Sequence, residues 1–183
     1  MKFKTELSIL DQYATGILPK SLFFFLGIIL LSISSKISIP FYPVPMTLQT
    51  FVVYFIAASM GMVGFYSTVS YVLIGLMGLP IFAAGGGLGY IMSPTFGFLY
   101  GMVLSSLFIA YFSKHLFNKN IIKLTLAIII GAIITFVCGV AHLASFIGLE
   151  KAFAAGFLPF MYSEFLKIAL AILTSYLLIK KIN

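Results

Sequence analysis

A carboxylate and an ammonium group lie inside an apolar stretch, PFMYSEFLKIAL, residues 159–170. Glu164 and Lys167 are three residues apart, so a helix would place both side chains on one face. Pro159 suits the first turn of such a helix, and Lys167 then lies roughly 12 Å from the outer end of the helix. Burying a lysine at this depth costs about 2.5–3.5 kcal/mol, so it should face a partner or a cavity. The two residues either neutralise each other as a structural pair or contact a ligand, and we favour the second interpretation.

Other side chains that could contact a small molecule occur in the segment IPFYPVPMTLQT, residues 39–50. Thr47 and Gln49 lie at the start of a predicted helix, where they can hydrogen-bond a ligand or only cap and cross-link helices. Tyrosine rings could stack on a ligand, although tyrosine is also enriched at membrane interfaces, which is the better interpretation for any one of them. The tyrosines in question are Tyr42, Tyr90 and Tyr100.

Three prolines of this segment, Pro40, Pro43 and Pro45, restrict its backbone. Each fixes φ near −65°, lacks an N–H and restricts the residue before it, so the segment resists forming helix or strand and stays extended. We expect a semi-rigid cover beside a ligand site, with Phe41 and Tyr42 as candidate apolar contacts.

The sequence contains no pattern typical of catalysis or metal binding. GGGLG, residues 85–89, does not continue as GxGxxG, and no GxxxxGK[ST] occurs in the chain. These glycines could let the backbone approach a small molecule or could simply form a flexible turn. His142 has no second ligand at metal spacing, and Cys138 lies in an apolar run, so we interpret both as packing residues. We therefore predict no catalytic residue, no metal and no resident cofactor.

The elements that must position these residues are membrane helices. Of 183 residues, 62% are hydrophobic and 8% are charged, a composition outside that of soluble domains. A helix needs about 20 mostly apolar residues to cross the bilayer. We therefore predict an all-α membrane protein of one domain, residues 1–183, with a tight glycine-containing hairpin between the second and third of six spans. The predicted spans are 20–37, 46–64, 66–84, 94–113, 121–143 and 158–179.

The distribution of lysines predicts the orientation. Lys36 and Lys151 fall on one side of the spans and eight lysines fall on the other, which should be the cytoplasmic side. The eight are Lys2, Lys4, Lys20, Lys114, Lys119, Lys123, Lys180 and Lys181. Both termini are then cytoplasmic, and the long connections, with any ligand site, are extracytoplasmic. Because the lysines cluster at the ends of apolar runs, we expect the bilayer, and no nucleic acid, as their partner.

Three segments resemble, in order and spacing, the signature segments of the BioY biotin-transporter family. They are IPFYPVPMTLQT, YVLIGLMGLPIFAAGGGLGYIMSPTFGF and GFLPFMYSEFLKIAL, and the resemblance covers roughly residues 20–180. It implies a substrate-binding component, or S component, of an energy-coupling-factor importer in a bacterial inner membrane. It also implies a transmembrane coupling protein and two ATP-hydrolysing subunits as partners, in agreement with the missing nucleotide motif.

The resemblance implies roles for individual residues. Biotin has a ureido ring with two N–H donors and a carbonyl, an apolar sulfur ring and a carboxylate. Glu164, at a position where the family usually has Asp, would accept from the ureido N–H groups, and Lys167 would donate to either the carbonyl or the carboxylate oxygen. The other expected site residues are Phe41, Tyr42, Thr47, Gln49, Phe82, Gly86 and Tyr90.

The sequence departs from the family pattern at several places. Glu164 adds a methylene, PTFGF replaces a PTGGY pattern, and residues 80–100 contain neither asparagine nor arginine. In this family group, the first span carries an alanine-spaced pattern that packs against the coupling protein. The first span of this chain lacks that pattern and has Phe23, Phe24 and Phe25 instead.

We expect biotin uptake without enzymatic activity. The alternatives are the same fold with another small acidic or ureido-like ligand, an intramembrane enzyme, or a purely structural subunit.

Overall fold

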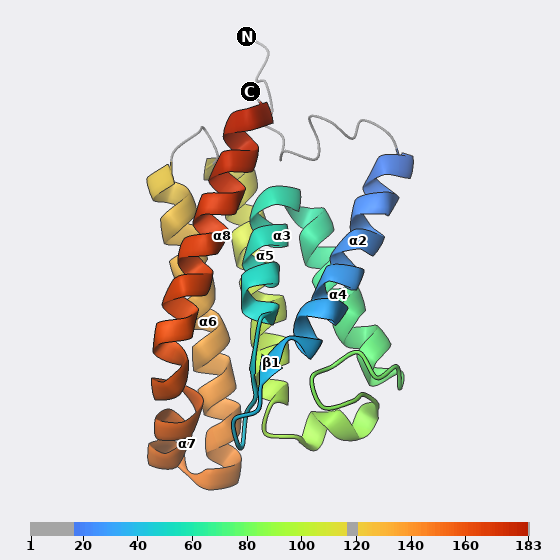
Figure 1. Ribbon diagram of the computed structural model, residues 1–183. Helices are drawn as coiled ribbons and strands as arrows, with labels where there is room; N and C mark the ends of the chain where they lie inside the picture. The colour runs from blue at the N-terminus through green and yellow to red at the C-terminus, as the bar shows by residue number, and fades with distance from the viewer. Residues whose placement is uncertain (1–16, 117–120, 183) are drawn as a thin grey trace.

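A computed structural model of the chain describes residues 17–116 and 121–182. Long helices run side by side in a bundle (Figure 1). The helices are α2 (Ile17–Lys36), α3 (Gln49–Met60), α4 (Met62–Leu76), α5 (Phe96–Leu116), α6 (Ile121–Ile147), α7 (Leu149–Gly156) and α8 (Met161–Ile182), with 3₁₀ turns η1 (Leu88–Met92) and η2 (Leu158–Phe160). Strands β1 (Ser38–Ile39) and β2 (Met46–Thr47) form one short antiparallel hairpin. The prediction of an all-α membrane architecture is confirmed. The prediction that residues 39–50 form no strand is wrong at Ile39, Met46 and Thr47, which take part in this hairpin on either side of the prolines.

Three segments of the described chain are long and apolar enough to cross a membrane, judged by length and composition. They are Leu18–Lys36, Ile121–Ile147 and Leu149–Leu178, and shorter apolar helices are Gln49–Met60, Met62–Leu76 and Phe96–Phe112. Each predicted span therefore contains one apolar helix, while the number of crossings and the orientation stay predictions. Of the lysines used for the orientation, Lys2, Lys4 and Lys119 lie outside the described residues.

Several predicted span boundaries differ from the helices by a few residues or more, and two of the differences have clear local reasons. The second span was predicted from residue 46, but Met46 and Thr47 pair with β1, so the helix begins at Gln49. The third was predicted to continue to residue 84, but α4 ends at Leu76. Gly78 has a φ of 112°, and the proline at position 80 disfavours helical conformation in the residue before it. The following apolar residues therefore form a loop.

The predicted hairpin between the second and third spans is confirmed. Gly61 alone separates α3 from α4, and its φ of 57° is a conformation that residues with a Cβ rarely adopt. The sequence did not predict α7, which lies in the stretch before the last span that we expected to be a connection.

Helix α3 lies at the centre of the bundle and packs against α8, α5, α4 and α2. Its sequence is apolar on nearly all sides, as expected for a helix enclosed by others. Val53, Tyr54, Ile56 and Ala57 are fully buried. Polar side chains on α3 therefore face neighbouring helices.

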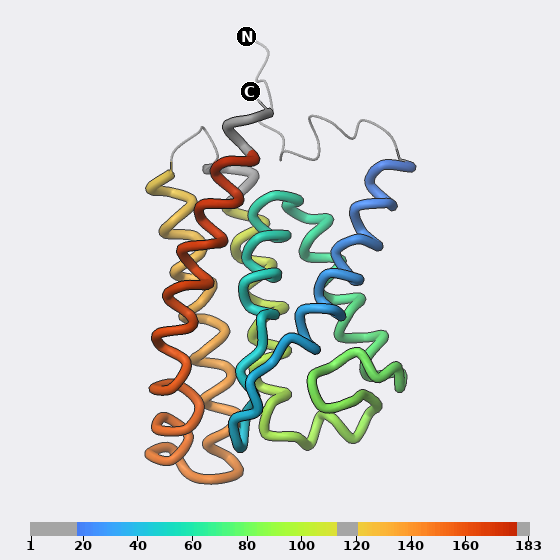
Figure 2. Tube along the Cα trace, in the orientation of Figure 1, coloured from blue at the N-terminus to red at the C-terminus, as the bar shows by residue number. Residues whose placement is uncertain are grey.

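The long connections gather at one end of the bundle. Figure 2 shows residues 37–48, 77–95 and 148–160 together at the lower end. The start of α2 and the end of α8 lie at the upper end (Figure 1). Residues 37–48 and 77–95 contain six of the nine predicted site residues, and these two connections are thus neighbours in space.

Candidate functional site

The carboxylate of Glu164 is the centre of a buried hydrogen-bond cluster. Its Oε2 atom accepts hydrogen bonds from the Thr50 hydroxyl at 2.9 Å and from Nζ of Lys167 at 3.1 Å, and Oε1 accepts one from the Tyr54 hydroxyl at 2.8 Å. Glu164 is 5% exposed and Lys167 is 7% exposed. The i, i+3 spacing on α8 brings the pair together as predicted, and the i, i+4 spacing on α3 aims both hydroxyls at it. A buried ion pair needs such additional partners to offset its desolvation.

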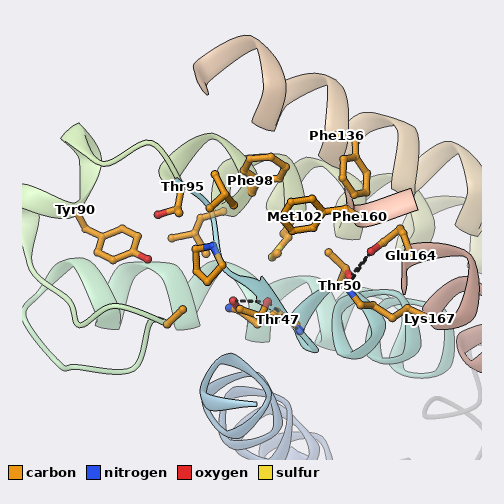
Figure 3. A pocket seen from close by; sticks show the side chains of 15 residues that line it. Thr47, Thr50, Tyr90, Thr95, Phe98, Met102, Phe136, Phe160, Glu164 and Lys167 are labelled. Carbon is orange, nitrogen blue, oxygen red and sulfur yellow. Dashed lines mark hydrogen bonds and ion pairs between the residues drawn. The ribbon is translucent and has the colours of Figure 1, made fainter. Parts of the chain in front are cut away.

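This cluster borders a cavity lined by residues of α3, α5, α6 and α8 and of the connections 37–48 and 77–95 (Figure 3). Figure 3 shows Glu164 and Lys167 at one end and Tyr90 at the other, with aromatic and aliphatic side chains between them. The residues that line the cavity are Val44, Pro45, Thr47, Gln49, Thr50, Ala83, Tyr90, Thr95, Phe98, Leu99, Met102, Phe136, Phe160, Glu164 and Lys167. The cavity thus combines a polar end with an apolar wall.

The wall consists largely of stacked and edge-on aromatic rings. The rings of Phe98 and Phe160 are stacked with centroids 6.4 Å apart, and Phe136 meets both edge-on at 5.9 and 6.2 Å. Such an apolar surface suits a ring or an alkyl chain and offers no hydrogen bond.

The cavity has a volume of about 40 Å³ in this structure. Pockets that enclose small-molecule ligands usually have volumes of about 300–1,000 Å³, so a vitamin-sized molecule requires part of the wall to move. Val44, Pro45 and Thr47 belong to the short hairpin over the cavity, which is held by the pairing of Ser38 with Thr47 and of Ile39 with Met46. Because so few backbone hydrogen bonds hold it, we expect the hairpin to open more easily than the helices of the wall.

The structure brings five of the predicted site residues to the cavity. Thr47, Gln49 and Tyr90 line it together with Glu164 and Lys167. The Thr47 hydroxyl donates a hydrogen bond of 3.1 Å to Oε1 of Gln49. The side-chain nitrogen of Gln49, Nε2, in turn donates a 2.8 Å hydrogen bond to the hydroxyl of Tyr71 in α4. Gln49 therefore connects the cavity to the interior of the bundle.

The other four predicted residues surround the cavity without lining it. Phe41 packs on Phe160 with ring centroids 6.4 Å apart, and Tyr42 is 96% exposed. Phe82 is fully buried, with its ring 4.7 Å from that of Tyr90. Gly86 lets its loop approach another backbone segment, because a Cβ there would lie 2.1 Å from the carbonyl oxygen of Leu79. Contact between a ligand and any of these four stays a prediction.

The sequence identified Lys167 as a partner of Glu164 but not Thr50 and Tyr54. These two residues carry a weak signal, since their hydroxyl groups lie one turn apart on a largely apolar helix. That spacing shows a shared polar face but not which helix it faces. The three phenylalanines of the wall carry no signal, since the chain contains 20 phenylalanines.

Comparisons with known proteins agree with these features. The model of the BioY family matches residues 11–183. The chain belongs to the BioY family. A relative from Thermotoga maritima named "Biotin transporter BioY" is 35% identical over 157 residues, covering 84% of this chain and 91% of the relative. A relative from Pyrococcus horikoshii named "Probable biotin transporter BioY" is 34% identical over 150 residues, covering 81% and 88%.

A solved structure shares the fold. It is described as the S-component for biotin from an ECF-type ABC transporter, and it matches with a TM-score of 0.77 over 93% of each chain at 23% identity. BioY membership, together with the long apolar helices, makes this chain a multi-pass membrane protein. It also agrees with the prediction of a transporter component and not an enzyme, which removes the intramembrane-enzyme alternative.

Proposed function

We propose that this BioY-family protein binds biotin in the cavity beside Glu164 and Lys167 and takes part in biotin uptake. The observation that carries the proposal is the buried ion pair, with hydrogen-bonding capacity left on both partners, that borders a cavity with an aromatic wall. A structural pair alone does not require a cavity. The names of the relatives from T. maritima and P. horikoshii support biotin as the ligand.

The chemistry of the cavity suits the ureido ring of biotin at the Glu164 end. A carboxylate has about four acceptor positions, and Thr50, Tyr54 and Lys167 occupy three of them. One position, on Oε1, is left for a ureido N–H. Lys167 has further N–H donors for the ureido carbonyl, and Phe98, Phe136 and Phe160 suit the sulfur ring and the alkyl chain. The second ureido N–H then needs a neutral acceptor, such as the hydroxyl oxygen of Thr50.

We propose further that the protein works with the coupling module of an energy-coupling-factor importer, a transmembrane coupling protein and two ATP-hydrolysing subunits. The match to an S-component structure supports this through the shared fold. The first described helix, α2, has a continuous exposed apolar face that includes Leu22, Ile29 and Ile33 and that could pack against a coupling protein. Co-expression with a coupling protein and its ATPases should yield a complex after affinity purification of this chain, and recovery of this chain alone would count against the module.

Direct titration of the purified protein tests the ligand. We expect biotin to bind tightly and to raise the melting temperature, while other vitamins in the same thermal-shift panel have no effect. A well-folded preparation with no detectable biotin binding at micromolar concentration would contradict the assignment.

One observation favours a second candidate, another small acidic or ureido-like ligand. Glu164 replaces the shorter carboxylate usual in the family and is already held by three donors. The ligand that fits the remaining acceptor position could differ from biotin. The thermal-shift panel separates the two candidates, because a stronger shift with another compound would favour the second.

A further inference from the structure

The cavity has no surplus positive charge for an anionic ligand. Among the residues that line it, Lys167 is the cation and Glu164 the anion, and their charged atoms are 3.1 Å apart. The pair has no net formal charge, and Lys167 already uses one donor on its partner. Moving an uncompensated carboxylate from water against an apolar wall is costly, so an anionic ligand needs a further cation or must leave its charge in water.

Lys36, the last residue of α2, contacts the glycine-rich connection that borders this cavity. Its Nζ donates a 2.6 Å hydrogen bond to the carbonyl oxygen of Phe82, and the next residue, Ala83, lines the cavity. The preceding residue of α2 makes a second contact with the same connection. The Ser35 hydroxyl donates a 2.6 Å hydrogen bond to the carbonyl oxygen of Ile81. Lys36 is thus joined to the glycine-rich connection beside the cavity.

A second set of contacts joins the same end of α2 to the hairpin. The backbone N–H of Leu48 donates a 3.1 Å bond to the carbonyl oxygen of Ile37. Ser38 pairs with Thr47, which lines the cavity. Lys36 is therefore positioned between the two connections that form the rim.

The glycine-rich connection that Lys36 contacts also supplies the end of the cavity opposite Glu164. Tyr90, which follows Ala83 in the glycine-rich connection, lies at the opposite end of the cavity from Glu164 and Lys167 (Figure 3). A long ligand with a neutral polar ring at one end and a carboxylate at the other matches this arrangement, with the ring at the ion pair and the carboxylate toward the rim.

We propose that Lys36 binds the carboxylate of the ligand, and this assignment rests on the proposed function. A lysine ammonium has three N–H donors, and among the described residues the Phe82 carbonyl accepts one. Lys36 is exposed, so water weakens the interaction. A solvent-exposed ion pair of this kind changes affinity by about fivefold.

The test compares biotin with biotinamide, in which a neutral amide replaces the carboxylate. In Lys36→Gln we expect biotin to bind about fivefold more weakly, while biotinamide binds as it does to the wild type. Lys36→Arg keeps the charge and should keep most of the biotin affinity. Lys151→Gln removes a lysine from α7, at the same end of the bundle, and should leave both affinities unchanged.

Three outcomes would overturn the assignment. If Lys36→Gln weakens both ligands equally, Lys36 only fastens the loop through Phe82. If the substitution changes neither affinity, or if Lys151→Gln reproduces the loss, the carboxylate is not held at this position. Failure of wild-type protein to bind either ligand would instead refute the proposed function itself, so the two failures can be distinguished.

Discussion

The hydroxyl of Tyr54 in α3 donates a 2.8 Å hydrogen bond to Oε1 of Glu164 in α8. Tyr54 is fully buried and does not line the cavity, so it holds the carboxylate from the interior of the bundle and not from the ligand side. Together with Thr50 and Lys167 it fixes the position of both carboxylate oxygens. The most enclosed helix of the bundle thus determines where the acceptor of the site lies.

Replacing Tyr54 by phenylalanine should destabilise the protein more than it weakens ligand binding. The change removes a buried hydrogen bond to a charged group, which contributes about 1.5–3 kcal/mol to the free energy of unfolding. Thr50 and Lys167 still hold the carboxylate. Thermal denaturation in detergent should show a lower melting temperature for Tyr54→Phe than for the wild type. Tyr66→Phe, at a residue that is 53% exposed, should keep the wild-type melting temperature. Equal melting temperatures for the two variants would contradict the role given to Tyr54.

Replacing Gly86 by alanine should displace the glycine-rich connection. The added Cβ would lie 2.1 Å from the carbonyl oxygen of Leu79 and 2.9 Å from that of Gly75, and backbone atoms cannot move aside independently. We expect a loss of about 1–3 kcal/mol in stability. Biotin affinity should also fall, since Ala83 and Tyr90 of the same connection line the cavity.

Gly89→Ala provides the matched control for this loop. A Cβ at position 89 has no atom within 4 Å, so this substitution should change neither melting temperature nor affinity. If Gly86→Ala behaves in the same way, the close approach of the two backbone segments has no importance for the site.

Replacing Phe41 by alanine should speed ligand release. Its ring packs on Phe160, a residue of the cavity wall, and so holds the proline-rich hairpin over the cavity. We expect a several-fold faster dissociation rate in stopped-flow displacement, with a smaller effect on association. Tyr162→Ala, at a side chain that is 84% exposed and is not among the predicted site residues, should leave both rates unchanged. If both substitutions have the same effect, the packing on Phe160 does not hold the hairpin.

Hydropathy and spacing were sufficient to predict the six apolar helices and the ion pair, but not the short helix α7. Charges inside apolar runs are rare, so Glu164 and Lys167 were identifiable as a pair from sequence alone. Hydropathy could not separate an apolar loop from the end of a helix. The stretch after Leu76 is apolar because Phe82 is buried, yet Gly78 and the nearby proline exclude helix there.

The remainder of the site depends on contacts between distant parts of the chain. Thr50 and Tyr54 are more than 100 residues from Glu164, and a neutral hydroxyl in an apolar helix does not indicate which neighbour it faces. The same holds for Lys36, which the sequence presents only as a charge at a helix end. Its contact with the Phe82 carbonyl depends on how the end of α2 packs against the connection 77–95, which the sequence does not show.

The central claim, that Glu164 and Lys167 form the polar end of a biotin site, is tested most directly by a biotin titration of wild-type protein and the double variant Glu164→Gln, Lys167→Met. The two substitutions keep the size of both side chains and leave no unpaired buried charge, so the fold should persist. We predict tight binding by the wild type and a loss of about 100-fold or more in the variant, because at least two hydrogen bonds to charged groups disappear. A variant that folds and binds biotin as tightly as the wild type would show that the pair is only structural.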